Sequence, residues 1–269
     1  MSCRKACTIM KLSRSVYHYR EVDTKDQQVT EELTRLAGLN PGYGFWKMHD
    51  RLRLEGYKWN HKRVYRVYRL LHLNIRRKHK KRLPSRQAVA MSTPERPLQM
   101  WSMDFMSDSL YNGRRVRVLN IIDDYNRQAL RMEVGYSITA YRIIQILEQL
   151  VETYGKPMCV RTDNGPEFIS HTLMDWCHKK RIQMHFIQPG KPMQNCFIER
   201  FNGSFRKEIL DAYVFYSLED LRLRTHQWMN DYNYYRPHDA LNGLTPFLYL
   251  NRNIKHENLN QITNFELVL

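Results

Sequence analysis

The sequence predicts an α/β domain built on a mixed five-stranded sheet flanked by helices, preceded by a small basic module made only of helices. Three observations support this class. Positive charge is concentrated in the first third of the chain, apolar residues recur there at helical spacing, and β-rich runs alternate with helical patterns after residue 98. With 269 residues, 42% of them hydrophobic, the chain can form one or two domains, which excludes general disorder.

The same patterns divide the chain into five segments. Pro94 and Pro97 cannot continue a helix and indicate a linker between the basic module and the α/β domain. We therefore expect a short helical segment over 1–30, a helix-turn-helix-like module over 31–90, a linker over 91–97, the α/β domain over 98–250 and a tail over 251–269.

Composition also limits the location of the protein. No apolar run approaches the ~20 residues that a membrane span needs, and the first ten residues carry charge where a signal peptide would be apolar. Five cysteines without a CxxC pair predict neither a disulfide framework nor a Cys-rich zinc site. We expect a cytoplasmic protein that has no membrane partner.

The basic module predicts a nucleic-acid partner. Between Arg51 and Arg86 there are 14 lysine or arginine residues and one acid, Glu55. Positive charges at this density repel one another, and binding to DNA or RNA relieves the repulsion and releases counterions. One helix is expected to end at Glu55-Gly56, and Asn60 can cap a second helix with an apolar face and a basic face. The candidate DNA contacts in this module are Lys62, Arg63, Arg66, Arg69, Arg76, Arg77 and Lys78.

The second domain reads as strands followed by alternating helices and strands. The predicted strands are 98–106, 114–122, 129–134, 158–161 and 184–187, and the predicted helices are 139–155, 167–180 and 193–210, with a further helix after Ser217. This order of elements is typical of a ribonuclease-H-like domain.

Three carboxylates fall at places where this fold would bring them together. Asp104 lies on the first strand, Asp163 follows the fourth strand, and Glu199 lies beside the buried face of a helix. Two hard cations held by carboxylates can activate the attacking oxygen and stabilise the leaving oxygen of a phosphodiester. Without cations the three acids would repel one another, so we expect a site assembled by two ions such as Mg²⁺. The alternative is three unrelated surface acids.

Several local sequences carry a resemblance to a known family. The chain resembles bacterial insertion-sequence transposases, specifically the second-reading-frame product whose catalytic core is similar to retroviral integrase. The resemblance covers about residues 13–250 and rests on WSMDFM, IIDDYNR, RTDNGPEF, QPGKPMQNCFIERFNGSFR, YNYYRPHDALNGLTP and, ahead of the core, GYGFWKMHDRL and GYKWNHKRVYRVYRLLHL.

The resemblance implies a DDE triad formed by Asp104, Asp163 and Glu199. It implies that water cuts a DNA strand to leave a 3′ hydroxyl, which then attacks a second phosphodiester. Because one phosphodiester replaces another, no ATP is needed, and the sequence has no GxxxxGK motif. The implied partners are double-stranded DNA, further copies of this chain on that DNA, and an upstream-frame product that recognises the element ends.

Other functions and roles remain open at this stage. A nuclease or junction resolvase of the same fold would hydrolyse without joining, and a DNA-binding regulator of transposition would be inactive without the upstream-frame module. Lys191, Asn202 and Arg206 are candidate phosphate contacts or merely solvated residues. Asp123 and Asp124 favour a turn over a metal site. A structural role is expected for the segment from Tyr235 to His238.

Overall fold

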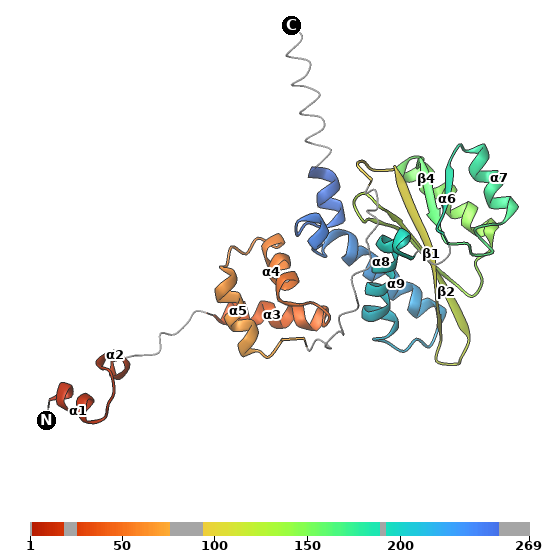
Figure 1. Cartoon of the computed structure of the whole chain (residues 1–269). Coiled ribbons are helices and arrows are strands. Elements are labelled where there is room, and N and C mark those ends of the chain that lie inside the picture. Colours follow the sequence, from red (N-terminus) through yellow and green to blue (C-terminus); the bar gives the residue numbers. More distant parts are fainter. Residues whose placement is uncertain (1, 19–25, 76–93, 189–191, 253–269) are drawn as a thin grey trace, which may run out of the picture.

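The computed structural model describes residues 2–18, 26–75, 94–188 and 192–252 (Figure 1). Two short helices, α1 (Cys3–Ile9) and α2 (Arg14–Tyr17), pack against each other near the amino terminus, and each begins at a serine that caps it. No helix within the described residues is apolar enough, over sufficient length, to cross a membrane. The expected tail over 251–269 lies outside the described residues, except for its first two.

The basic module consists of α3 (Gln27–Leu39), α4 (Phe45–Leu54) and α5 (His61–Leu70). Asn60 caps α5 as expected, because its side-chain oxygen accepts the Lys62 backbone N–H at 2.9 Å. The helix α3 was not expected from the sequence, and it crosses the boundary predicted at residue 31. The buried residues that join the three helices are Val29, Leu33, Leu36, Tyr43, Met48, Leu52, Val64, Val67 and Tyr68.

The α/β domain contains the expected mixed five-stranded sheet. Its strands are β1 (Met100–Ser109), β2 (Arg115–Asp123), β3 (Ala129–Gly135), β4 (Cys159–Thr162) and β5 (Gln183–Phe186). They lie in the order β3-β2-β1-β4-β5. The first three strands are antiparallel, whereas β4 runs parallel to β1 and β5. Central β1 is therefore the point at which the pairing changes from antiparallel to parallel.

Helices cover both faces of the sheet. On one face, α6 (Ala140–Tyr154) and α7 (His171–Lys179) bury one cluster of apolar residues. On the other face, α8 (Cys196–Phe205) and α9 (Leu218–Tyr234) bury a second cluster. Consecutive residues of β2 enter different clusters, since Val118 faces α8 and α9 whereas Leu119 faces α6 and α7. This alternation is the pleat of a strand that is buried on both sides.

The helix expected over 193–210 is divided into three parts. A 3₁₀ turn (Pro192–Asn195) precedes α8, and a π-helical turn (Arg206–Leu210) follows it. In the π turn the Asp211 N–H donates to the carbonyl oxygen of Arg206 at 2.7 Å. Ile209 and Leu210 are both buried there, so the wider turn places two successive apolar residues against the core.

The helical module contacts the core at the carboxyl-terminal end of α9. The Asp231 carboxylate accepts a hydrogen bond from the Tyr43 hydroxyl at 3.3 Å and forms an ion pair with Arg51 at 3.4 Å. The Arg51 guanidinium also lies over the Tyr235 ring, 4.8 Å from its centroid. In Figure 1, α5 lies on the side of the module that faces away from the core. The basic helix α5 therefore lies away from the core.

Candidate active site

Asp104 lies on the central strand and faces α8. Trp101 and Met103 point into the core under α6, so the alternation along β1 turns Asp104 toward the opposite face. Asn120 of β2 is the direct partner of Asp104 in the antiparallel register and shares that face. The first carboxylate is thus fixed on the most central strand of the sheet.

Asp163 follows β4 immediately and comes level with Asp104. The parallel register pairs Ser102 with Arg161, and two further residues along each strand bring Asp104 and Asp163 side by side. The Asp163 carboxylate accepts the Gly165 backbone N–H at 3.0 Å. A Cβ at Gly165 would lie 3.1 Å from that carboxylate oxygen, so this glycine permits the tight exit from the strand.

Glu199 is presented by α8, the helix that packs on the face of the sheet toward which Asp104 points. Ile198, Phe201 and Phe205 of that helix are buried against the sheet and fix its orientation. The Glu199 side chain itself is exposed, in the first turn of the helix. Three elements distant in the sequence therefore position the three predicted acids.

The electrostatics of Asp104 reflect its burial and the acids near it. The pKa of Asp104 rises to about 6, chiefly because the group is buried and further because Asp163 and Glu199 add negative charge nearby. Hydrogen bonds from the Phe105 N–H and the Asn202 amide oppose this rise. The Asp104 carboxylate is therefore costly to keep charged, and a bound cation would offset that cost.

The acids do not yet form a closed metal cage. Throughout the described parts of the chain, no group of three or more His, Cys, Asp or Glu side chains is arranged to hold a metal ion. The donor set nevertheless suits Mg²⁺ or Mn²⁺, which prefer carboxylate oxygen. Glu199 is exposed, so its side chain has the freedom to change rotamer and close the set.

Two consecutive side-chain amide hydrogen bonds hold the Asp104 carboxylate in place. Asn202 of α8 donates to the Asp104 carboxylate at 2.7 Å, and Asn120 of β2 donates to the Asn202 amide oxygen at 2.7 Å. Both asparagines are buried. The phosphate contact expected of Asn202 stays a prediction, but its amide is engaged within the protein.

Asn120 is a site residue that sequence reasoning missed. It is fully buried in β2, within the apolar run of VRVLNIID. A polar side chain at the centre of an otherwise apolar strand requires a hydrogen-bond partner, and this was the available signal. Its partner could not be identified because Asn202 lies on an element 82 residues away.

A second pair anchors the loop that carries Asp163. Glu167 forms an ion pair with Arg117 of β2, and the Arg117 guanidinium stacks on the Phe105 ring, 3.9 Å from its centroid. Phe105 in turn stacks on Phe168. The segment forms a turn, in which the backbone N–H groups of Phe168 and Ile169 donate to the Gly165 carbonyl oxygen. The helix α7 begins only after its cap Ser170, not at residue 167 as predicted from the sequence.

Asp123 and Asp124 have structural partners. Asp123 accepts the backbone N–H groups of Tyr125 at 2.8 Å and Leu98 at 2.9 Å, as expected of a turn residue. Asp124 is buried and forms an ion pair with Arg161 at 2.8 Å. Burial raises the pKa of Asp124 to about 6, although Arg161 opposes the rise. These contacts favour the turn interpretation over a competing metal site.

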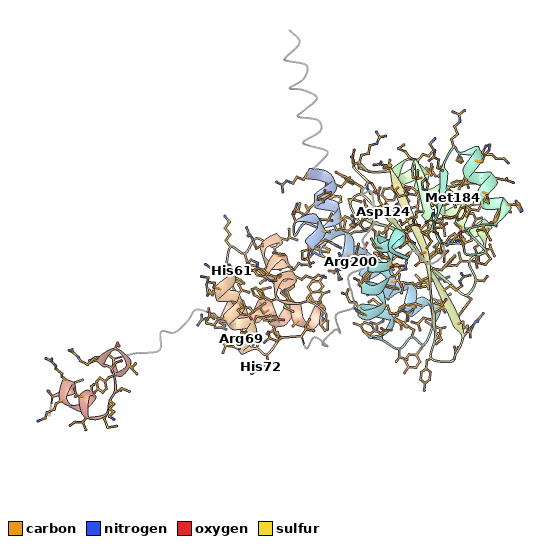
Figure 2. The ribbon with its side chains drawn as sticks, in the orientation of Figure 1. His61, Arg69, His72, Asp124, Met184 and Arg200 are labelled. Carbon is orange, nitrogen blue, oxygen red and sulfur yellow. The ribbon has the colours of Figure 1, made fainter. Side chains whose placement is uncertain are left out.

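The candidate DNA contacts fall into different environments. Lys62 and Arg69 are exposed on α5, and Figure 2 shows Arg69 on the helical module. Arg63 and Arg66 both form ion pairs with Asp26.

Arg206 donates to the Ser107 carbonyl oxygen at 2.8 Å while its side chain stays 39% exposed. The remaining candidates, Arg76, Arg77, Lys78 and Lys191, lie outside the described residues.

The segment from Tyr235 to His238 is tied to the core, in accord with the structural role expected of it. Arg236 is buried and donates hydrogen bonds to the Glu208 carboxylate of the π turn from Nη1 and Nη2. Burial and the nearby Arg236 lower the pKa of His238 to about 3, so this imidazole is neutral at pH 7. The segment lies against the helical module as well, since Arg236 approaches the Tyr43 ring.

Comparisons with known proteins agree with this architecture. Two models described as integrase core domain match residues 94–192 and 180–246, and a model described as HTH-like domain matches residues 26–81. The chain is 38% identical to the insertion element IS407 uncharacterized 31.7 kDa protein of Burkholderia multivorans, over 91% of this chain and 89% of that protein.

A second relative is the insertion element IS476 uncharacterized 39.2 kDa protein of Xanthomonas euvesicatoria. It is 36% identical over 91% of this chain and 71% of its own length. Among solved structures, the HTLV-2 integrase catalytic core domain in complex with magnesium (trimeric form) matches with 20% identity and a TM-score of 0.45, over 57% of this chain and 96% of that chain.

Proposed function

Because this chain belongs to the bacterial insertion-sequence transposases with an integrase-type core, we propose that Asp104, Asp163 and Glu199 form the site at which it cuts and joins DNA strands. The observation that carries the proposal is geometric: the parallel register brings Asp163 level with Asp104, and α8, which carries Glu199, is tied to Asp104 by the hydrogen bond from Asn202. Three carboxylates held close together repel one another, and bound cations would remove that repulsion.

The three acids would hold two divalent ions, Mg²⁺ or Mn²⁺. Such ions, when bound, supply the charge that activates an attacking oxygen and stabilises a leaving oxygen. The protein's own groups set the geometry. Asn202 orients the Asp104 carboxylate, and the Gly165 N–H orients that of Asp163. Glu199 completes the set from the exposed side, where DNA can approach.

The remaining partners follow from the same activity. The exposed basic side chains of α5, Lys62 and Arg69, are placed to contact DNA phosphates, because that helix faces away from the core (Figure 1). Cutting two element ends requires at least two active sites, so we expect the chain to act as a homo-oligomer on DNA. An upstream-frame product would add recognition of the ends, and without it we expect weak transposition.

A strand-transfer assay tests the proposal. The substrate is a labelled duplex that carries the ends of the chain's own element, incubated with a second duplex and Mg²⁺. Joined product supports a transposase, cleavage without joining would favour a nuclease of the same fold, and binding alone would favour a regulator. The Glu199→Gln variant should lose cleavage and joining by more than about a hundredfold while DNA binding persists.

Glu152→Gln is the matched control, because Glu152 is exposed on α6 on the opposite face of the sheet. It removes the same charge and should leave both products unchanged. Full activity of Glu199→Gln would show that Glu199 is not part of the site.

A further inference from the structure

A small cavity lies where the helical module meets the core, beside the helix that carries Glu199. Its volume is about 120 Å³. Pockets for drug-sized ligands occupy roughly 300–1,000 Å³, so this one suits a single small group. Figure 2 shows Arg200 at this junction. The charged residues of the lining are Lys47 of α4, Arg127 of the β2–β3 turn, Arg200 of α8, Arg236 and Asp239.

The lining has more positive than negative charge. Glu208 binds Arg236 through two hydrogen bonds and so balances its charge. Three cationic side chains, Lys47, Arg127 and Arg200, then share the cavity with the single acid Asp239. Cations gathered this way repel one another, and an anion in the cavity would relieve the repulsion.

The Arg127 guanidinium has a fixed orientation and, in the part of the chain that the structure describes, an unpaired donor atom. Its backbone φ is +62°, a left-handed conformation that residues other than glycine rarely adopt. Its guanidinium lies over the Phe197 ring, 3.3 Å from the centroid, which fixes the plane of the group. Within the described residues, the buried Nη1 atom of Arg127 has no hydrogen-bond partner. An oriented cationic donor without a partner is typical of a site whose acceptor comes from a ligand.

Lys47 adds a contribution from the other module. Burial lowers the pKa of Lys47, and the neighbouring charge of Arg236 lowers it further. A buried amine beside another cation costs free energy to keep charged unless an anion lies close to it. The cavity therefore collects cations from both the helical module and the core, and Arg200 directly follows Glu199 in α8.

We propose that this cavity binds one backbone phosphate of DNA, held jointly by Lys47, Arg127 and Arg200. The proposal rests on the proposed function, because it takes DNA as the source of the phosphate. A phosphate bound there would join the helical module to the core at a fixed distance from the catalytic acids. DNA binding and the relative position of the two modules would then be coupled.

The test is a double-mutant cycle on DNA binding in EDTA, in which no chemistry occurs. The dissociation constant for a duplex of arbitrary sequence is measured against salt concentration for Lys47→Gln, Arg200→Gln, the double variant and the control Lys156→Gln. Lys156 is exposed after α6, on the opposite face of the sheet. Each cavity variant should weaken binding about tenfold and lower the salt slope by up to about 0.9.

The double variant distinguishes a shared phosphate from separate contacts. If Lys47 and Arg200 hold the same phosphate, the double variant should lose clearly less than the sum of the single losses. Lys47→Arg should retain the wild-type affinity. Additive losses, no losses, or an equal loss in Lys156→Gln would each overturn the proposal. Thermal unfolding of each variant verifies that it is folded.

A second arm separates DNA from free phosphate. Inorganic phosphate is added to the protein without DNA, at matched ionic strength against chloride, and the unfolding temperature is measured. Stabilisation that both cavity variants lose, together with unchanged DNA binding, would identify free phosphate as the ligand and overturn the DNA assignment. Both arms omit Mg²⁺, so their results do not depend on catalysis. A chain that binds DNA but neither cuts nor joins it would refute the proposed function without affecting the test of the phosphate site.

Discussion

At the scale of single residues, the charged carboxylate of Asp104 that is proposed to bind metal lowers the stability of the folded protein. Burial and the two neighbouring acids raise its pKa to about 6 from the ordinary value of 3.8. The folded state therefore binds the proton more tightly than the unfolded state does. Stability is consequently lost as pH rises from about 4 to 6, and the full penalty is present at pH 7.

Asp104→Asn should remove this penalty. In metal-free buffer at pH 7 the variant should be more stable to unfolding than the wild type, by up to about 3 kcal/mol, since one pH unit corresponds to about 1.4 kcal/mol. The advantage should vanish below about pH 4, where the wild-type carboxyl is protonated in both states. Denaturant unfolding across this pH range measures the difference. A variant that is less stable at pH 7 would contradict the account of Asp104.

Gly165 tests the position of Asp163. In Gly165→Ala the new Cβ would lie 3.1 Å from the Asp163 carboxylate oxygen and push that group away. Strand cleavage should fall roughly ten- to hundredfold, since displacements of about 1 Å have effects of that size. The stability should change by less than about 1 kcal/mol, because Gly165 needs no left-handed conformation.

Gly203→Ala is the matched control for this substitution. Gly203 lies in α8, and a Cβ there would meet nothing within 4 Å. Alanine is the better helix former, so the control should gain about 0.5–1 kcal/mol of stability with unchanged cleavage. Equal cleavage by the two variants would show that the Gly165 turn does not position Asp163.

At the scale of elements, the hydrogen bonds from Asn120 to Asn202 and from Asn202 to Asp104 link β2, α8 and β1. Asn202→Ala would remove the donor to Asp104 and leave the buried Asn120 amide without that acceptor. Stability should fall by about 1–3 kcal/mol. The pKa of Asp104 should rise further, because the lost hydrogen bond favours the charged carboxylate.

The readout for Asn202 is the pH dependence of strand cleavage. In Asn202→Ala the acidic limb of the profile should move to higher pH, in addition to any loss of rate. A purely structural role would lower the rate without moving the limb. An unmoved limb would therefore exclude Asn202 as a positioning residue for Asp104.

The elements also show what the sequence could predict. All five strands were expected close to their observed positions, because their apolar patterns depend on burial within the sheet. The start of α7 was expected too early because the ion pair between Arg117 and Glu167 is a long-range contact. The π turn after α8 was missed because the spacing of apolar residues does not distinguish backbone hydrogen bonds that span five residues, as in a π-helix, from those that span four, as in an α-helix.

At the scale of the whole molecule, the sequence is enough to propose the three acids as a site, but it does not predict their surroundings. Asp104, Asp163 and Glu199 follow from strand order and family motifs. The junction between the modules depends on pairs such as Tyr43 with Asp231, which are 188 residues apart and have no local signature. The cavity at that junction was unpredictable for the same reason, since its cations come from four separate segments.

The central claim is that side chains from β1, the end of β4 and α8 close together on divalent ions. Anomalous diffraction from crystals of the DNA complex grown with Mn²⁺ tests it most directly. We predict anomalous peaks bound by carboxylate oxygens of Asp104, Asp163 and Glu199 at about 2.0–2.3 Å. Manganese bound without Glu199, or at a place remote from Asp104, would contradict the account.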